Sequence, residues 1–348
     1  MAEAIESVLA QTEPDWELIL VDNNASEETK RVAADYVGKL PQKIQILHEP
    51  MQGLGYARNR GIFAAKGQYI ALLDDDDLMY PERLSSQVSL MEKNDHCVLS
   101  YGLRDDVSHD NRQILKTVTT ESHFEFFPFS TQFLSLNLNF PTPRPSSIMV
   151  RADAMREIGG FDPHFNPFFL EDWDLYFRLS RLGDFLCIPK SLIRYRIPSE
   201  DLFKKKHIRN MKKNRLMKNG DYFYQKFVRY FSKKGLLENP YVKKDLKKLK
   251  ARWLRENSFE FLGVRGYEHF ARILLFRSLT TSFSFKSLKH LIRSFYPHAI
   301  RSERYRSYYL YGQDLVEGID KEMLWNMFKG SHKCEFCHEG EIANKISV

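Results

Sequence analysis

Four consecutive aspartates, Asp74, Asp75, Asp76 and Asp77, are the residues of this chain best suited to chemistry. They directly follow an apolar run at residues 69–73, which reads as a buried strand. Like charges this close repel, so the carboxylates must bind a cation, stay in water or take up protons. Carboxylate oxygens suit Mg²⁺ or Mn²⁺, ions that commonly bridge a protein carboxylate to substrate phosphates. The alternative is an exposed acidic turn that caps the helix after Pro81, and the sequence leaves both interpretations open.

Another acidic residue, Asp22, stands in a similar position behind a second apolar run. Residues 16–21 are almost continuously apolar, and Asp22 is followed by two asparagines, which favour a turn. Residues 44–47 and 68–73 read as further buried strands, separated by helical patterns. Buried strands spaced by helices indicate right-handed βαβ crossovers and a parallel sheet. Ligands bind beyond the carboxyl ends of such strands, so Asp22 and the aspartate run are both candidate ligand positions.

Two further acids, Glu171 and Asp172, begin a helical pattern over residues 170–182. This pattern turns Trp173 and Phe177 mainly toward the core and leaves the two acids on the first turn, facing a cleft. Residues 147–151 and 184–197, on either side, read as strands. The alternative for Glu171 and Asp172 is that they only complement the helix dipole.

Several segments, taken in order, resemble the inverting nucleotide-sugar glycosyltransferases of family 2. The resemblance covers roughly residues 1–200 and implies an α/β chain with the GT-A fold, a Rossmann-like, mostly parallel sheet flanked by helices. The segments that carry it are AIESVLAQT at 4–12, WELILVD at 16–22, ARNRG at 57–61, GQYIALLDDDD at 67–77, GGFD at 159–162 and EDWDL at 171–175.

The resemblance implies a donor side for the site. Asp22 would accept a hydrogen bond from the nucleotide base, and Arg58 would lie near the nucleotide. Asp74 and Asp76 match the outer positions of the family's DxD motif, and Asp75 adds an acid between them. Asp76 would hold Mg²⁺ or Mn²⁺ on the donor diphosphate, while Asp74 would help hold the ribose or sugar. The metal would neutralise charge on the departing nucleoside diphosphate.

The resemblance also implies an acceptor side. Asp172 would be the general base, since inversion at the anomeric carbon needs a carboxylate that takes the acceptor hydroxyl proton. The acceptor would bind at a loop and at the neighbouring acid, namely Gly160, Phe161, Asp162 and Glu171.

Two features depart from the family pattern. The opening strand, which belongs to the interior of the sheet, is missing before the helix that begins near Ala4, so we expect either a start upstream of Met1 or an impaired remnant. Many relatives also carry a His shortly after the Tyr-Arg of the last strand, whereas here Pro198 follows and the nearest histidine is His207. A histidine ligand for the metal is therefore not expected.

The charge divides the 348 residues into two parts. Residues 1–200 carry a net charge of −10 and residues 201–348 carry +17, which sum to the overall +7. We expect a catalytic domain at 1–200 and a basic, mainly helical region at 201–348. Because no nucleic-acid module accompanies the lysine clusters, an anionic membrane surface or a lipid-linked acceptor is the expected partner, rather than nucleic acid. Solvated basic helices packed on the catalytic domain are the alternative.

The remaining features bound the class of protein. The longest apolar stretches fall far short of the roughly 20 residues of a spanning helix, and the first residues do not read as a signal peptide. The four cysteines do not make a disulfide framework, which indicates a cytoplasmic protein, with a peripheral position at the inner membrane face as a further expectation. Cys334, Cys337 and His338 spell a haem-attachment pattern, but a complete metal site would need further ligands, and we expect neither haem nor zinc there.

These observations predict a metal-dependent inverting glycosyltransferase. It would move a sugar from a nucleotide-diphosphate donor to a hydroxyl acceptor, a surface glycan or a lipid-linked glycan. The first alternative is a catalytically impaired, truncated relative that acts as a binding or scaffold module. The second is a nucleotidyltransferase on a similar fold, which would release pyrophosphate.

Overall fold

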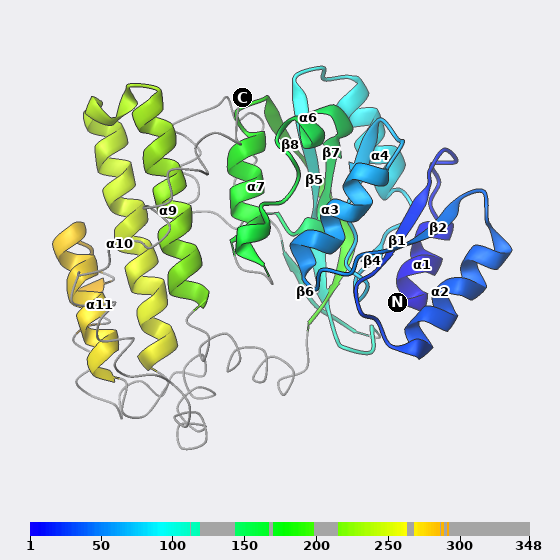
Figure 1. The fold of residues 1–348 in the computed structure, drawn as a ribbon, viewed down its shortest axis with the longest axis horizontal. Coiled ribbons are helices and arrows are strands. Elements are labelled where there is room, and N and C mark those ends of the chain that lie inside the picture. Colours follow the sequence, from blue (N-terminus) through cyan, green and yellow to red (C-terminus); the bar gives the residue numbers. More distant parts are fainter. Residues whose placement is uncertain are drawn as a thin grey trace. The chain divides into compact units, whose positions relative to one another are not determined.

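A computed structural model of the protein describes most of the first 200 residues and three helices beyond them (Figure 1). The described residues are 1–111, 113–118, 143–166, 170–197, 215–262, 268–285, 287–288 and 291. Those up to 197, together with 215–249, form one compact unit, and those from 250 onward belong to a second. The units therefore do not divide at residue 200, where the change in composition puts the boundary.

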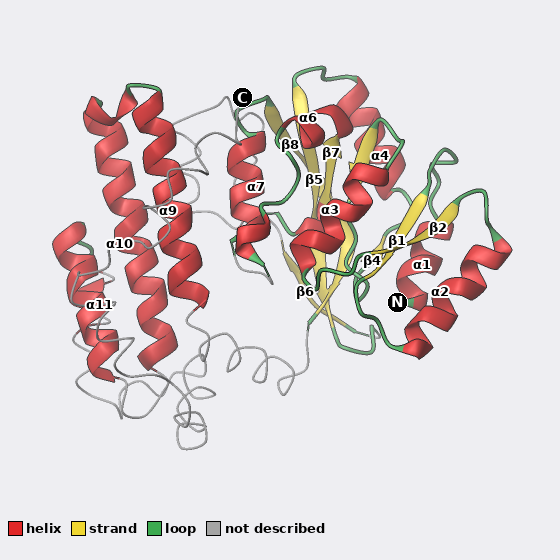
Figure 2. Cartoon of the chain, viewed as in Figure 1, coloured by secondary structure: helices red, strands yellow, loops and turns green. Residues whose placement is uncertain are grey.

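The described residues of the first unit contain eight strands, which form two separate sheets (Figure 2). One sheet holds β1 and β2, and the other has the order β3-β7-β5-β8-β4, with β6 paired to β5. The strands are β1 (Leu18–Asp22), β2 (Ile44–His48), β3 (Tyr69–Ala71), β4 (Leu78–Met79), β5 (Cys97–Val107), β6 (Ile114–Val118), β7 (Ile148–Arg151) and β8 (Asp184–Arg196).

The strand pairing is mixed, which corrects the prediction of a mostly parallel sheet. β1 pairs with β2 and β5 with β8 in parallel, whereas β3–β7, β5–β7, β5–β6 and β4–β8 are antiparallel. The predicted α/β class is confirmed. The difference arises because β7 runs antiparallel between β3 and β5, an arrangement that the βαβ pattern of the first 110 residues does not reveal.

The helical pattern predicted at residues 170–182 is found as α7, and residues with capping character mark the starts of other helices. Ser26 caps α2, since its hydroxyl accepts the Thr29 amide at 3.2 Å, and Gly53 precedes α3 with a φ of 148°. The helices are α1 (Ala2–Leu9), α2 (Glu27–Lys39), α3 (Leu54–Ala64), α4 (Arg83–Glu92), α6 (Ala152–Glu157), α7 (Glu171–Leu179), α9 (Arg215–Lys233), α10 (Pro240–Leu262) and α11 (Glu268–Thr281), with short 3₁₀ turns at Pro145–Ser147, Pro163–Phe165 and Leu236–Glu238.

A buried arginine on α4 ties the ends of two sheet strands together. Arg83 is fully buried, and its guanidinium donates to the carbonyls of Leu72 and Ile148 at 3.0 and 2.9 Å and to Gln87 at 3.1 Å. Burial lowers the pKa of Arg83 to about 9, which leaves it charged at neutral pH. Because Leu72 stands just before the aspartate run, Arg83 fixes the backbone from which that run departs.

Helix α9 joins the first unit through an aromatic cluster. Phe177 of α7 stacks on Phe227 of α9 with ring centroids 3.9 Å apart, and Phe223 meets Phe227 edge to face at 4.6 Å. Phe165, Phe231 and the start of α10 complete this buried group. Such rings remove large apolar areas from water, which explains why residues 215–249 belong to the first unit.

The second unit is described by the end of α10 and by α11. Leu274 of α11 is buried, and Ser278 donates to the Ala251 carbonyl of α10 at 2.7 Å. Within the described ranges, no helix is both long and apolar enough to cross a membrane. Several features of the predicted basic region lie outside the described residues, namely His207, the lysines at 204–206 and the Cys334–His338 pattern.

Candidate active site

The aspartate run forms a turn, named here the acidic turn (residues 74–77), between β3 and β4. The Asp77 amide donates to the Asp74 carbonyl at 3.1 Å, and the Asp74 amide donates to the Ser146 hydroxyl at 3.1 Å. These bonds close the turn and leave the Asp75 and Asp76 side chains exposed. Of the four aspartates, these two can offer their carboxylates to a ligand in solvent.

Arg196, at the end of β8, holds the acidic turn from behind. Its amide donates to the Asp77 carboxylate at 3.0 Å, and its Nε donates to the Asp76 carbonyl at 2.9 Å. Its remaining nitrogens donate to the His109 carbonyl at 2.7 Å and to the Glu3 carboxylate at 2.5 Å. One arginine therefore joins the turn to α1 and to the loop after β5.

Asp77 differs from its neighbours because it is buried, with 1% of its surface exposed. Burial raises the pKa of Asp77 to about 7, against the opposing hydrogen bonds from Ser146 and the Arg196 amide. Asp77 is thus part of the support for the turn, although the sequence alone presents four equivalent acids.

Arg58 of α3 links the acidic turn to α7. Its guanidinium donates to Asp74 at 2.7 Å and lies 3.6 Å from the Glu171 carboxylate, with 9% of its side chain exposed. It also lies over the Phe161 ring, 5.1 Å from the centroid. The structure therefore brings Arg58, Asp74, Phe161 and Glu171 together, as a single site requires.

Glu171 and Asp172, named here the acid pair, begin α7 immediately after Leu170, which takes a left-handed φ of 69°. Glu171 is buried, with 9% exposed, while Asp172 is half-buried. Dense packing and the charge of Glu171 raise the pKa of Asp172 to about 7, although its bond from the Trp173 amide and the charges of Arg58 and Arg144 oppose this. Asp172 can therefore exchange a proton near neutral pH, which is the property of a general base.

Asn59 fixes the loop that carries Gly160 and Phe161. Its side-chain amide accepts from the Phe161 amide at 2.7 Å and donates to the Phe161 carbonyl at 2.8 Å. Gly160 has a φ of 69°, and a Cβ there would lie 2.4 Å from the Asn59 oxygen. Only glycine fits this approach, so the loop shape follows from the sequence GGF.

Asp162, which is predicted to bind the acceptor, contacts the 3₁₀ turn at Pro163–Phe165 and α9, and its role at the acceptor stays a prediction. One carboxylate oxygen accepts the His164 amide at 2.9 Å; the other accepts Tyr222 and Lys226 of α9 at 3.0 and 2.8 Å. Lys226 also lies 2.5 Å from the fully buried Asp174. These bonds give Asp162 the role of anchoring α9, which no pattern in residues 1–200 indicates.

Asp22 lies at the end of β1, in the two-stranded sheet, and its contacts are local. Its carboxylate accepts the Ala25 amide at 2.9 Å and lies 3.4 Å from His48. The Ala25 bond, with help from Lys30 and His48, lowers the pKa of Asp22, so it is a carboxylate at neutral pH. Among the described residues it has no direct contact with the acidic turn, and its predicted role at the nucleotide base stays a prediction.

Four polar residues of the site were not predicted from the sequence, namely Asn59, Arg144, Ser146 and Arg196. Arg144 lies over the Tyr195 ring, 4.9 Å from the centroid, and its charge acts on Asp172. The signal that was available is its position between Pro143 and Pro145, which fix the backbone on both sides. The other three act through hydrogen bonds to distant segments, and no local pattern reveals these.

The described residues contain no group of three or more His, Cys, Asp or Glu side chains that could hold a metal ion. A closed, all-protein site is therefore not formed there. Mg²⁺ is more often bound by one or two carboxylates together with substrate phosphates. The exposed carboxylates of Asp75 and Asp76 fit that second mode, in which a metal arrives with a diphosphate.

Residues 1–159, somewhat less than half of the chain, match the model of glycosyl transferase family 2. The matched segment covers the acidic turn, Asp22 and Arg58, and it ends just before Gly160. The match agrees with the family resemblance described in the sequence analysis.

Curated relatives agree with the family 2 match. A glycosyltransferase of Methanocaldococcus jannaschii is 28% identical over 69% of this chain and 78% of its own length. The glycosyltransferase EpsE of Bacillus subtilis is 31% identical over 53% of this chain and 63% of its own length. A Rickettsia prowazekii glycosyltransferase is 30% identical over 57% of this chain and 59% of its own length. The chain thus spans less than two thirds of the second and third of these relatives.

Solved structures agree on the fold. Staphylococcus aureus TarS, crystallised with UDP, has a TM-score of 0.52 and 16% identity, over 89% of this chain and 86% of that one. The mannosyltransferase PcManGT of Pyrobaculum calidifontis, in complex with GDP-Man and Mn²⁺, has a TM-score of 0.52 and 14% identity, over 90% and 80%. At these identities the likeness concerns the fold, and the predicted GT-A class is confirmed.

Proposed function

We propose that the chain is a metal-dependent inverting glycosyltransferase that uses a nucleotide-diphosphate sugar. The observation that carries the proposal is the position of Arg58, which contacts Asp74 of the acidic turn and Glu171 of the acid pair. A diphosphate bound at the turn would therefore lie close to a carboxyl group with a pKa near neutrality. A reaction that transfers a sugar directly from donor to acceptor requires the donor site and the general base to lie close together, and here they lie on adjoining elements.

The donor side would be formed by Asp22, Arg58, Asp74, Asp75 and Asp76. Asp76 would hold Mg²⁺ or Mn²⁺ together with the diphosphate, and when bound the metal would offset charge on the leaving group. Asp74 would orient the ribose or sugar, since Arg58 and Ser146 fix both its carboxylate and its backbone. Support for a nucleotide-sugar donor also comes from the UDP and GDP-Man bound to structural neighbours.

On the acceptor side, Asp172 would remove the proton of the acceptor hydroxyl. The hydroxyl oxygen would bond to the anomeric carbon as the bond from that carbon to the diphosphate oxygen breaks, with inversion. Glu171 would assist by keeping the pKa of Asp172 high enough for proton transfer near pH 7. Gly160 and Phe161 would border the acceptor, and Asp162 would position α9.

A donor screen tests this proposal. The full chain is incubated with UDP- and GDP-linked sugars, with Mn²⁺ or Mg²⁺ or with a chelator, and the released nucleotide is identified. Metal-dependent release of a nucleoside diphosphate supports the proposal, and release of pyrophosphate would identify a nucleotidyltransferase instead. If the chain binds none of the donors, the alternative of a binding or scaffold module is favoured. The observation that motivates this alternative is that β1 and β2 form a sheet separate from the six-stranded sheet.

The surroundings of the reaction also belong to the proposal. Residues 1–200 would supply the catalytic residues of a domain that α9 and the start of α10 complete. The basic residues within 201–348 would bring this domain to an anionic membrane surface at the cytoplasmic face, where a surface or lipid-linked glycan grows. The net charge of +17 in this region supports electrostatic attraction, which adds about 1 kcal/mol per basic residue near such a surface.

Vesicle binding tests this part separately. The chain should bind vesicles containing phosphatidylserine at low salt, and binding should weaken as the Debye length falls from about 10 Å at 0.1 M to about 3 Å at 1 M salt. Replacing Lys204, Lys205 and Lys206 by Gln should reduce binding. The matched control replaces the exposed Lys39, Lys66 and Lys93 of the acidic part by Gln and should have little effect. Vesicle binding that does not change with salt concentration, or an equal loss of vesicle binding in both variants, would contradict the membrane role.

A further inference from the structure

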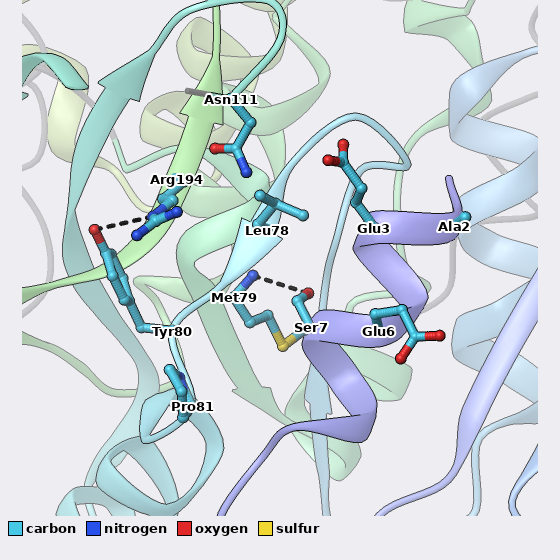
Figure 3. Close-up of a pocket in the computed structure, with 10 residues that line it drawn as sticks. All are labelled: Ala2, Glu3, Glu6, Ser7, Leu78, Met79, Tyr80, Pro81, Asn111 and Arg194. Atoms are coloured by element: carbon cyan, nitrogen blue, oxygen red, sulfur yellow. Dashed lines mark hydrogen bonds between the residues drawn. The ribbon is translucent and has the colours of Figure 1, made fainter. Parts of the chain in front are cut away.

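A hollow of about 450 Å³ lies beside the acidic turn, on the side of α1 (Figure 3). Its walls come from the first two turns of α1, from the segment that leaves the acidic turn through β4, and from β8. Leu78, only two residues after Asp76, stands at its centre in the view of Figure 3. The hollow is large enough for one sugar ring, and the catalytic scheme above does not use it.

The lining combines an apolar floor with polar groups on its rim. Leu78, Met79, Tyr80 and Pro81 form a continuous stretch of backbone along the floor. Arg194 and Asn111 lie on one side of this stretch and Glu3 on the other (Figure 3). Ligand sites in proteins commonly have this composition, a mainly apolar wall with a few convergent polar groups.

Arg194 is held in place but keeps hydrogen-bonding capacity. Its guanidinium lies over the Tyr80 ring, 5.2 Å from the centroid, and its Nε donates to the Tyr80 hydroxyl at 3.3 Å. That hydroxyl donates to Asp105 at 2.6 Å, which fixes the ring beneath the arginine. The two terminal nitrogens of Arg194 have no hydrogen-bond partner among the residues that the structure describes, so they remain available to a ligand.

Asn111 brings an amide nitrogen to the same side of the hollow, where it points toward Leu78 (Figure 3). It has a left-handed φ of 59°, a backbone conformation that an asparagine tolerates better than most residues. Its amide oxygen is buried and has no hydrogen-bond partner within the described part of the chain, so only the nitrogen can serve a ligand, as a second donor beside Arg194.

The charged side chains on the rim of the hollow favour a neutral ligand over an ionic one. Glu3, paired with Arg196, faces the hollow opposite Arg194, so an anion would meet a carboxylate and a cation would meet a guanidinium. A neutral ring with many hydroxyls and one apolar face satisfies both sides, because a hydroxyl can donate to Glu3 and accept from Arg194 or from the Asn111 amide nitrogen. We propose that this hollow binds a saccharide unit.

The hollow is also connected to the acidic turn by direct bonds. Arg196 joins the Glu3 carboxylate to the Asp76 carbonyl, and Leu78 continues the same backbone. Resting on the proposed function, the bound unit is a sugar of the acceptor glycan beyond the one that reacts. The enzyme would therefore favour an acceptor that already carries several sugars.

The test measures binding of simple glycosides to the full chain by titrated saturation-transfer NMR. The probes are the methyl glycosides of glucose, galactose, mannose and N-acetylglucosamine, with excess UDP and GDP present to fill the donor side. Arg194→Met keeps the aliphatic stem over Tyr80 and removes the donors, and Asn111→Gly removes the amide without backbone strain. Arg31→Met, at an exposed position on α2, is the matched control.

At least one glycoside should bind the unmodified chain. Its affinity should fall about five- to tenfold in Arg194→Met and about two- to fivefold in Asn111→Gly, with no change in Arg31→Met. Absence of binding by all four glycosides, equal affinity in the two hollow variants and the control, or displacement by inorganic phosphate would overturn the proposal. Nucleotide binding, measured on the same samples, distinguishes failure of one proposal from failure of the other. Absence of nucleotide binding counts against the proposed transferase activity, whereas the glycoside affinities alone test the proposed saccharide site in the hollow.

Discussion

The acidic turn and the acid pair use the same kind of side chain in opposite surroundings. At the acidic turn, Asp75 and Asp76 extend into solvent from a backbone that Arg196 holds. In the acid pair, Asp172 is half-buried beside another carboxylate, and its pKa is raised to about 7. A hydrated carboxylate keeps its charge and suits a cation, whereas a desolvated one exchanges protons near neutrality. Position, more than residue type, therefore separates metal holding from proton transfer.

The largest expected effect tests the acidic turn. Asp76→Asn should abolish sugar transfer and leave the fold intact, because the substitution keeps the shape of an exposed side chain and removes the negative charge that would hold the metal. Transfer assays with Mn²⁺ and a melting curve check the two parts. Asp75→Asn, a neighbour with similar exposure, is the matched control and should lose less activity. Full activity of Asp76→Asn in the presence of a chelator would show that the turn holds no catalytic metal.

The next effect tests the acid pair. Asp172→Asn keeps the shape of the side chain but cannot take a proton, so turnover should fall by roughly 10²–10⁴-fold. Donor affinity, measured by titration with the nucleotide, should survive because Asp172 is proposed to act on the acceptor. A collapse of donor affinity with normal turnover per bound donor would move Asp172 to the nucleotide side.

A smaller effect concerns pH. A base acts only when deprotonated, so activity should rise with pH and reach half its maximum near pH 7, where the raised pKa of Asp172 lies. Glu171→Gln removes the like charge that raises this pKa, so the rising limb should shift toward lower pH by roughly 0.5–1 unit. Initial rates across pH 5–9 measure the shift. Glu157→Gln, at an exposed site, is the control, and an equal shift there, or a shift to higher pH in Glu171→Gln, would contradict the assignment.

The smallest effect compares two adjacent glycines that shape the loop beside the acid pair. Both have a left-handed φ, 75° at Gly159 and 69° at Gly160, so an alanine at either costs roughly 1–2 kcal/mol of unfolding free energy. At Gly160 the added Cβ would also lie 2.4 Å from the Asn59 oxygen, whereas nothing lies within 4 Å at Gly159. Urea unfolding should show a larger loss of unfolding free energy for Gly160→Ala than for Gly159→Ala. Equal losses would mean that the Asn59 side chain can move away from the added Cβ at little cost.

The sequence was a good guide wherever the determinant is local. Ser26 and Gly53 mark helix starts because capping and glycine conformation are properties of a few adjacent residues. The end of β1 was predicted to within one residue for the same reason, since its apolar run stops at Asp22, whereas β3 ends at Ala71, two residues before its apolar run does. The candidate carboxylates could therefore be named from the sequence and from the family resemblance.

The rest depends on contacts between distant segments. The antiparallel insertion of β7 between β3 and β5 joins residues about 80 positions apart, and no hydrophobic period encodes such a pairing. The bonds of Asp162 to Tyr222 and Lys226 likewise form only when α9 is brought to it. Burial also separates Asp77 from its three identical neighbours, and burial is a property of the folded chain.

Lys226 sets a lower limit on the length of an autonomous catalytic fragment. It is the cation that α9 supplies to Asp162 and to the fully buried Asp174, although Arg178 also pairs with Asp174. A chain cut at residue 200 would lose Lys226 and would expose Phe165 and Phe177 to water. Removing the partner of a buried carboxylate strongly destabilises the fold, and exposed aromatic surface promotes aggregation. Expression trials should therefore end the catalytic fragment near residue 249, because α9 and the start of α10 are as much a part of it as the sheet.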